Sequence, residues 1–310
     1  MPRRALAAIL TIVAAGLFPA AALEIEGSAR FGNAAFPWDQ SAPSAGAFPG
    51  DSWSWGGSLG FDEYLSEGIR IDARYETDPV LRHVVAAAMV YESGFASIGL
   101  GPFLGVLGSA GTPLKAGIYT TVEVGWPGLA FAGLESASSV GAGLVSSGDL
   151  LLESSRLYLG WYVPNAICTL SVQTKRFDLM RTASVREQDA LNRYAFELDI
   201  FDKTAPYRIL TTLAYSTLSK TWDDEATVSL TDTLGALTLG GTLTVRVSPA
   251  FDLVGGFDAA VYAFGLDGMA ARSPAAATLL FNATLGFRVR FGRDLLEAAA
   301  AAQDTGPVTP

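Results

Sequence analysis

The stretch Thr284-Leu-Gly-Phe-Arg-Val-Arg-Phe291 decides the fold. It continues an alternation of apolar and polar residues that begins at Leu279. Successive side chains of a β-strand point to opposite faces. The apolar residues of this stretch therefore share one face, and Arg288 and Arg290 share the other. The first face is unsuited to water and the second is unsuited to a protein core. The pattern predicts a strand with hydrocarbon on one side and water on the other.

The N-terminus predicts export. Arg3 and Arg4 precede an apolar run from residue 5 to residue 18, and Ala20-Ala21-Ala22 forms an A-x-A cleavage site. The apolar run is short and is followed by small residues, which is typical of a secretory signal peptide rather than of a spanning helix. We therefore expect residues 1–22 to be a cleaved signal peptide.

The charge of the chain restricts its partners. The full sequence has a net charge of −10, and loss of Arg3 and Arg4 makes the mature chain more acidic still. An acidic chain disfavours nucleic acid as a partner. The single cysteine, Cys168, excludes an internal disulfide. It lies among apolar residues of an expected strand, where we expect it to face lipid.

Fourteen segments carry the alternation of a strand. One of them, Gly68–Glu76, places Arg70, Asp72, Arg74 and Glu76 on a single face. The uncharged window Ser93–Leu114 is long enough for a membrane helix, but it contains six glycines and two prolines, which are poor helix residues. The strands are expected at residues 23–31, 52–62, 68–76, 82–91, 95–106, 114–124, 129–135, 150–162, 166–176, 192–201, 207–218, 234–247, 251–264 and 276–291.

The connections between these segments alternate in character after the first strand. Tight turns, several with an aromatic residue such as Tyr64, Trp126 or Phe201 at the shoulder, alternate with longer connections such as 136–149 and 177–191. This asymmetry and the aromatic residues are expected of a membrane barrel. The segment 78–91 is ambiguous, because Asp78-Pro79 before an alanine run also resembles a helix start. If it is a helix, the expected count is twelve strands.

The pattern in Thr284–Phe291 resembles the C-terminal assembly signal of bacterial outer-membrane β-barrel proteins, whose last strand ends in an aromatic residue. Together with the alternation, this resemblance implies an all-β, transmembrane, antiparallel up-and-down barrel formed by residues 23–292. It implies outer-membrane lipid and the barrel assembly machinery as partners, the latter through Thr284–Phe291. Residues 293–310 are expected to be a periplasmic tail, so that both termini are periplasmic.

The sequence does not predict an enzyme. His83 is the only histidine, which excludes multi-histidine metal sites and leaves one candidate for histidine-based catalysis. Nothing near it in sequence supplies a partner, and we expect it at the surface or rim of the barrel. The acidic patch Asp223-Asp-Glu225 lacks the ligand spacing of a calcium loop. We therefore expect no catalytic residue, no metal and no cofactor.

The inward face of the expected strands is rich in charge, with positive and negative residues nearly balanced, which predicts weak charge selectivity. Because the first and last strands of a closed barrel are neighbours, Glu24 and Glu26 are expected beside Arg288 and Arg290. The residues expected to line the pore are Arg70, Asp72, Arg74, Glu76, Lys115, Glu123, Arg156, Lys175, Arg246, Asp258, Arg288 and Arg290.

Strand number predicts a passage, since eight-stranded barrels are filled by side chains and sixteen-stranded porins hold an aqueous channel. The first hypothesis is an outer-membrane channel for passive diffusion of small hydrophilic solutes. The second is transport of a hydrophobic ligand along inward apolar residues such as Leu210, Val254, Tyr262 and Leu280. The third is a non-transporting adhesin or envelope-structural barrel. Its contact surface would be the loop Phe177–Leu191, with Arg181, Arg186, Glu187 and Asp189.

Overall fold

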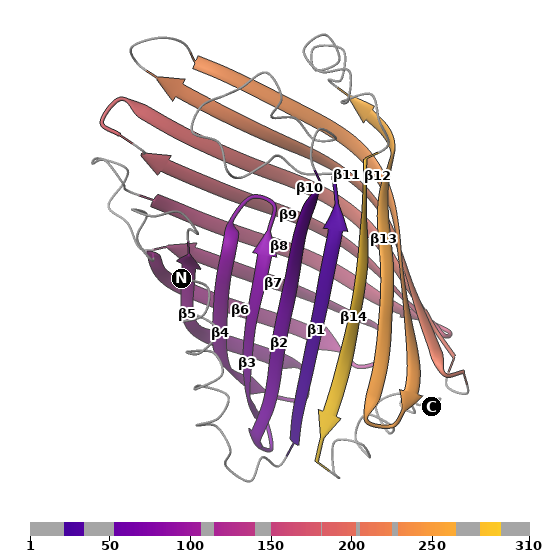
Figure 1. Ribbon diagram of the computed structural model, residues 1–310. Helices are drawn as coiled ribbons and strands as arrows, with labels where there is room; N and C mark the ends of the chain where they lie inside the picture. Colours follow the sequence, from indigo (N-terminus) through magenta and orange to yellow (C-terminus); the bar gives the residue numbers. More distant parts are fainter. Residues whose placement is uncertain are drawn as a thin grey trace.

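The computed structural model describes residues 22–33, 53–106, 115–139, 150–180, 182–202, 205–224, 229–264 and 280–292. Within them the chain forms a closed barrel of fourteen antiparallel strands (Figure 1). The strands are β1 (Ala22–Gly32), β2 (Ser54–Ser66), β3 (Ile69–Asp78), β4 (Arg82–Glu92), β5 (Ala96–Val106), β6 (Lys115–Trp126), β7 (Ala130–Ser139), β8 (Leu150–Val163), β9 (Ala166–Met180), β10 (Val185–Phe201), β11 (Tyr207–Asp224), β12 (Ser229–Ser248), β13 (Phe251–Phe264) and β14 (Phe281–Phe291).

The all-β barrel and the count of fourteen are thus confirmed, and the twelve-strand alternative is wrong. Residues 1–21 of the predicted signal peptide (1–22) and the predicted tail 293–310 lie outside the described residues, and Ala22 is the first residue of β1. Among the described residues, no helix is long and apolar enough to cross a membrane.

Each strand pairs with its neighbours in sequence, and β1 pairs with β14 to close the ring. Figure 1 shows β1 lying between β2 and β14. The connections β2–β3, β4–β5, β6–β7, β8–β9, β10–β11 and β12–β13 lie at one end of the barrel, which we call the tight-turn end. We call the opposite end the loop end.

The outer face of the barrel is apolar. Trp55, Leu157, Phe257 and Leu285 are 73%, 58%, 53% and 62% exposed, and all lie on the face opposite to the charged residues. A protein surface that presents so many large apolar side chains around its circumference is suited to hydrocarbon. Cys168 shares this outer face, opposite Trp161 and Leu198 in the sheet.

The aromatic residues beside the tight turns divide between the two faces. Tyr91 and Trp126 are exposed on the outer face, at 61% and 66%, where amphipathic rings suit a membrane interface. Tyr64 and Phe201, by contrast, face inward, since they lie opposite Arg70 and Arg208 in the register. Tyr64 and Phe201 therefore do not contribute to an aromatic belt at the membrane interface.

The ambiguous segment 78–91 forms a tight turn followed by β4. The carboxylate of Asp78 accepts hydrogen bonds from the backbone N–H groups of Val80 (2.8 Å) and Leu81 (2.9 Å). This is the bonding that an N-cap residue supplies to a helix, which explains why the sequence resembles a helix start. Here the same bonds stabilise the β3–β4 turn. Arg82, the first residue of β4, has a positive φ of 68°.

Four strands are longer at the loop end than the alternation predicts. β9 continues to Met180 and β10 starts at Val185, so most of the expected loop 177–191 belongs to a β-hairpin. In the same way, β11 continues to Asp224 and β12 starts at Ser229. Asp178 lies on the outer face and pairs with Arg176 and Arg186. The strands therefore continue beyond the apolar band with polar residues on their outer face. Here a segment that is polar on both faces is a strand and not a loop.

The register also corrects the face of Tyr262. A bulge in β13 shifts the pairing with β12 between Leu237 and Thr238, which places Tyr262 opposite Leu237. Leu237 belongs to the outer face, because Thr238 beside it faces inward. Tyr262 therefore lies on the outer face and not in the lumen.

The closing seam carries the expected ion pairs. The Arg290 guanidinium lies 2.7 Å from Glu24 and 2.7 Å from Asp252 of β13. Arg288 lies 3.1 Å from Glu24 and 3.3 Å from Glu26. In the β1–β14 register, Glu24 is opposite Arg290 and Glu26 is opposite Arg288. The predicted juxtaposition is confirmed, and it lies at the tight-turn end of the seam.

We predict that exchange of Arg288 and Arg290 for Glu impairs folding into detergent micelles, because the two introduced carboxylates would then lie against those of Glu24, Glu26 and Asp252 within the seam. The fraction folded is measured as the heat-modifiable band on a gel. Adding Glu24→Arg and Glu26→Arg should recover part of the folded fraction. Unchanged folding of the Arg288→Glu/Arg290→Glu protein would contradict a role of these pairs in closure.

The outer face yields a second prediction. Leu243→Arg places a charge in the hydrocarbon and should lower the free energy of unfolding by about 2–4 kcal/mol, less if the site is near an interface. Thr242→Arg, one residue away, enters the lumen and should cost less than about 1 kcal/mol. Urea unfolding in lipid vesicles measures both. An equal loss of unfolding free energy in the two variants would contradict a lipid-facing Leu243 and a water-facing Thr242.

Candidate functional site

The lumen is divided along its length into three parts with different linings. One part is a cavity of about 1460 Å³ at the tight-turn end, which we call the wide cavity. Its charged lining includes Glu26, Asp199, Arg208, Arg246, Asp252, Arg288 and Arg290, and its apolar lining includes Leu210 and Val254. A cavity of this size inside fourteen strands is wide enough to hold water and small solutes.

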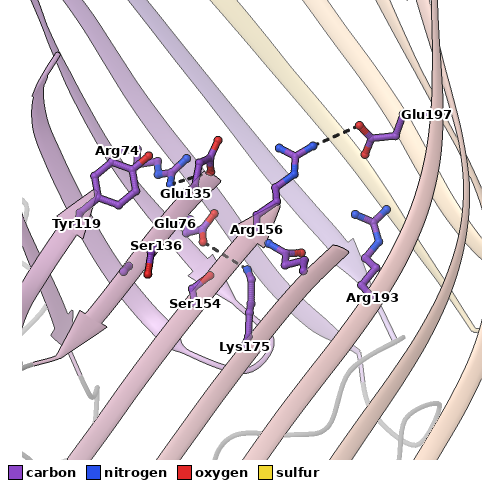
Figure 2. A pocket seen from close by; sticks show the side chains of 12 residues that line it. Arg74, Glu76, Tyr119, Glu135, Ser136, Ser154, Arg156, Lys175, Arg193 and Glu197 are labelled. Carbon is purple, nitrogen blue, oxygen red and sulfur yellow. Dashed lines mark hydrogen bonds and ion pairs between the residues drawn. The ribbon is translucent and has the colours of Figure 1, made fainter. Parts of the chain in front are cut away.

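A second cavity of about 250 Å³ lies halfway along the strands, and we call it the middle chamber (Figure 2). It is lined by Arg74, Glu76, Tyr119, Glu135, Ser136, Ala137, Ser154, Arg156, Gln173, Lys175, Arg193 and Glu197. These residues come from β3, β6, β7, β8, β9 and β10. The alternation places all of them inward except Ser136, which lies between Glu135 and Ala137 on β7, and the closure of the ring brings them together.

The ion pairs of the middle chamber are long. Arg74 lies 3.5 Å from Glu135, Arg156 lies 3.3 Å from Glu197, and Lys175 lies 3.7 Å from Glu76. The Arg74 guanidinium also lies 4.8 Å from the centre of the Tyr119 ring, a cation–π distance.

At the loop end the lumen is filled by the β3–β4 turn, residues Asp78–Arg82, which we call the latch. Asp78 pairs with Lys175 of β9, and Arg82 lies 2.9 Å from Glu187 of β10. β4 and β10 are six places apart in the ring of fourteen, so this second contact crosses the interior. Glu187 is fully buried and also lies 2.8 Å from Lys220.

Apolar packing holds the latch as well. Val80 and Leu81 are 0% and 2% exposed. They belong to a buried cluster that includes Phe103, Leu150, Leu152, Phe177, Leu179 and Leu280. The Arg82 guanidinium lies 4.1 Å from the centre of the Phe177 ring. The latch thus joins opposite walls of the barrel through ionic, apolar and cation–π contacts.

The residues expected to line the pore all lie on the inward face but in several places. Four of them, Arg74, Glu76, Arg156 and Lys175, line the middle chamber. Three others, Arg246, Arg288 and Arg290, line the wide cavity. The remaining five are dispersed: Arg70 pairs with Asp62 and Glu92, Glu123 accepts a hydrogen bond from Tyr158, and Asp72, Lys115 and Asp258 lie opposite Asp62, Gly105 and Gly240.

The sequence prediction missed Glu135 and Arg193 as inward residues. Arg193 shares one face of β10 with Glu197, so alternation alone could have placed it inward. His83 was expected at the surface or rim; it lies on the outer face of β4, where its Nδ1 is 2.9 Å from the Tyr75 hydroxyl. Among the described residues, no group of three or more histidine, cysteine, aspartate or glutamate side chains is arranged to hold a metal ion.

The third prediction tests the latch. Arg82→Gln leaves Glu187 with one cation fewer, and breaking a buried ion pair costs about 3–5 kcal/mol. The latch should then leave its site more often. The measurement is the rate at which a maleimide labels Leu81→Cys in a Cys168→Ser background, which should rise at least about tenfold. Arg208→Gln, a lumen change far from the latch, is the control. Equal labelling in all three proteins would contradict an ionic role in closure.

Comparisons with known proteins find solved structures that resemble this chain at low sequence identity. No protein-family model matches the sequence, and no curated protein matches it. Among solved structures, a porin is 10% identical, with 87% of this chain and 100% of that chain covered and a TM-score of 0.41. An outer-membrane channel from Pseudomonas putida F1 is 8% identical, with 88% and 96% covered and a TM-score of 0.46. A monoaromatic hydrocarbon channel, CymD, is 8% identical, with 87% and 89% covered and a TM-score of 0.39.

Proposed function

We propose that the protein is a non-enzymatic channel of the bacterial outer membrane that lets small hydrophilic solutes diffuse passively. The observation that carries this proposal is the combination of an apolar outer face with a lumen that holds charged cavities of about 1460 Å³ and 250 Å³. An apolar exterior around a polar interior is the arrangement of a membrane-spanning aqueous barrel.

The proposal includes an orientation and a route of insertion. The tight turns face the periplasm, as short turns do in outer-membrane barrels, and both termini lie on that side. Strand β14 carries the assembly signal Thr284–Phe291, with Leu285 and Phe287 on its outer face. Outer-membrane lipid contacts this face around the whole ring.

Passage through the channel is controlled at the loop end. The latch and its apolar cluster fill the described lumen there, so a solute passes only when the latch moves. Opening separates the Arg82–Glu187 and Asp78–Lys175 pairs and exposes Val80 and Leu81. The channel is therefore closed for most of the time and opens in brief events.

A second candidate is passage of a hydrophobic ligand. The specific observation in its favour is the buried apolar cluster at the loop end, which includes Leu280, together with Leu210 and Val254 in the wide cavity. Of the contact residues expected for the third candidate, an adhesin, Glu187 and Asp189 are buried inside the barrel at 0% and 4% exposure. Arg186 is 40% exposed, and Arg181 lies outside the described residues.

The fourth prediction is a single-channel recording of the mature protein in a planar lipid bilayer. Wild type should show brief openings, and Arg82→Gln should raise the open fraction without changing the size of each opening, since the middle chamber and the wide cavity are unaltered. Protein denatured by heat before addition is the control. If neither protein conducts ions, the hydrophilic channel is overturned, and lipid that copurifies with the barrel would then favour the hydrophobic-ligand candidate.

A further inference from the structure

The middle chamber has the dimensions of a binding site for one small molecule. Its volume of about 250 Å³ corresponds to about eight water molecules, at about 30 Å³ each in the liquid. A solute on its way through the barrel would exchange its water shell for the side chains of this chamber. The lining therefore decides which solutes are held there.

The arginines of the chamber have donors to spare. A guanidinium carries five N–H donors. Arg74 and Arg156 each contact one carboxylate, at 3.5 Å and 3.3 Å. Arg193 forms no ion pair with any residue that the structure describes. By contrast, Arg70 at the tight-turn end contacts two carboxylates at 2.5 Å and 2.6 Å.

The spare donors lie on one side of the chamber. In the register Arg156 and Arg193 both lie opposite Gln173 of β9, one on each side, and Figure 2 shows both side chains in the chamber with Glu197. Two guanidinium groups that share a cavity repel one another, and a carboxylate between them would relieve that repulsion while accepting hydrogen bonds from both. Guanidinium groups match the planar geometry of a carboxylate through parallel hydrogen bonds.

The other side of the chamber offers carboxylates. Glu76 and Glu135 lie there in Figure 2, with Arg74 between the chamber and Tyr119. Glu76 is 40% exposed and its contact with Lys175 is long, at 3.7 Å, while the ammonium of Lys175 lies closer to Asp78. Glu76 therefore has acceptor capacity for a second cationic group.

We propose that the middle chamber binds a small zwitterion of the α-amino acid type. Its carboxylate is held by Arg156 and Arg193, and its ammonium group by Glu76. The inference rests on the proposed channel function, because it names the class of solute that passes, but binding can be measured without conduction. The lining offers groups of both signs, so the site selects a solute that carries both charges, which a neutral sugar or a simple amine does not.

The fifth prediction uses three ligands of matched size with the mature barrel in detergent: alanine, propionate and propylamine. In isothermal titration alanine should bind most tightly, propionate at least about tenfold more weakly because it lacks the ammonium group, and propylamine not detectably. Absence of heat for all three ligands, or equal affinity for alanine and propionate, would overturn the inference. Conductance of the same preparation is measured in parallel.

Variants locate the site. Arg193→Gln should weaken alanine binding at least about tenfold, and Arg193→Lys should weaken it less. Glu76→Gln should weaken alanine binding but leave propionate unchanged. The matched control, Arg176→Gln, removes the same charge from the outer face of β9 and should leave binding within twofold. Heat-modifiability confirms that each variant is folded. Alanine binding that is unaffected by Arg193→Gln would overturn the assignment.

The two measurements separate this inference from the channel function. Binding of alanine without any conductance would retain the site and overturn the channel. Conductance without alanine binding would retain the channel and overturn the site. Conductance that alanine reduces, and propylamine does not, would support both.

Discussion

Closure of the hydrogen-bond ladder between β1 and β14 is the constraint on which the rest of the structure depends. In hydrocarbon an unpaired backbone N–H or C=O group costs several kcal/mol, so an open sheet edge cannot face lipid. The ring gives every strand two partners and so fixes which side chains face inward. Arg290 reinforces this closure by contacting Glu24 of β1 and Asp252 of β13, the strands on either side of its own.

Once the faces are fixed, depth along the barrel determines what the inward residues do. The same alternation supplies tight ion pairs at the tight-turn end, long ones in the middle chamber, and an apolar filling at the loop end. The latch combines ion pairs with apolar packing. A buried ion pair such as Arg82–Glu187 adds little net stability, because desolvation of both charges offsets their attraction. Packing of Val80 and Leu81 supplies the attraction, and the ion pair makes the docked position specific.

The sequence was sufficient for the strands and their faces, because a period of two is a local property that each segment carries in itself. It could not reveal partners across the lumen. Arg82 and Glu187 are 105 residues apart, and neither has a local pattern that points to the other. The segment 177–191 shows a further limit: polar residues on both faces are equally compatible with a loop and with a strand that rises above the membrane. The register of β9 with β10, not the alternation, decides between them.

The arginines of the lumen consequently fall into two groups with different roles. Arg70, Arg82 and Arg290 are held by short contacts to carboxylates and mark places where the wall or the latch is fastened. Arg156 and Arg193 are loosely held or unpaired within the described chain, so their positive charge is not consumed by the fold. Keeping such charges in a partly enclosed cavity costs desolvation energy. A solute that carries a negative charge would repay that cost on entering the chamber, as the proposed binding site requires.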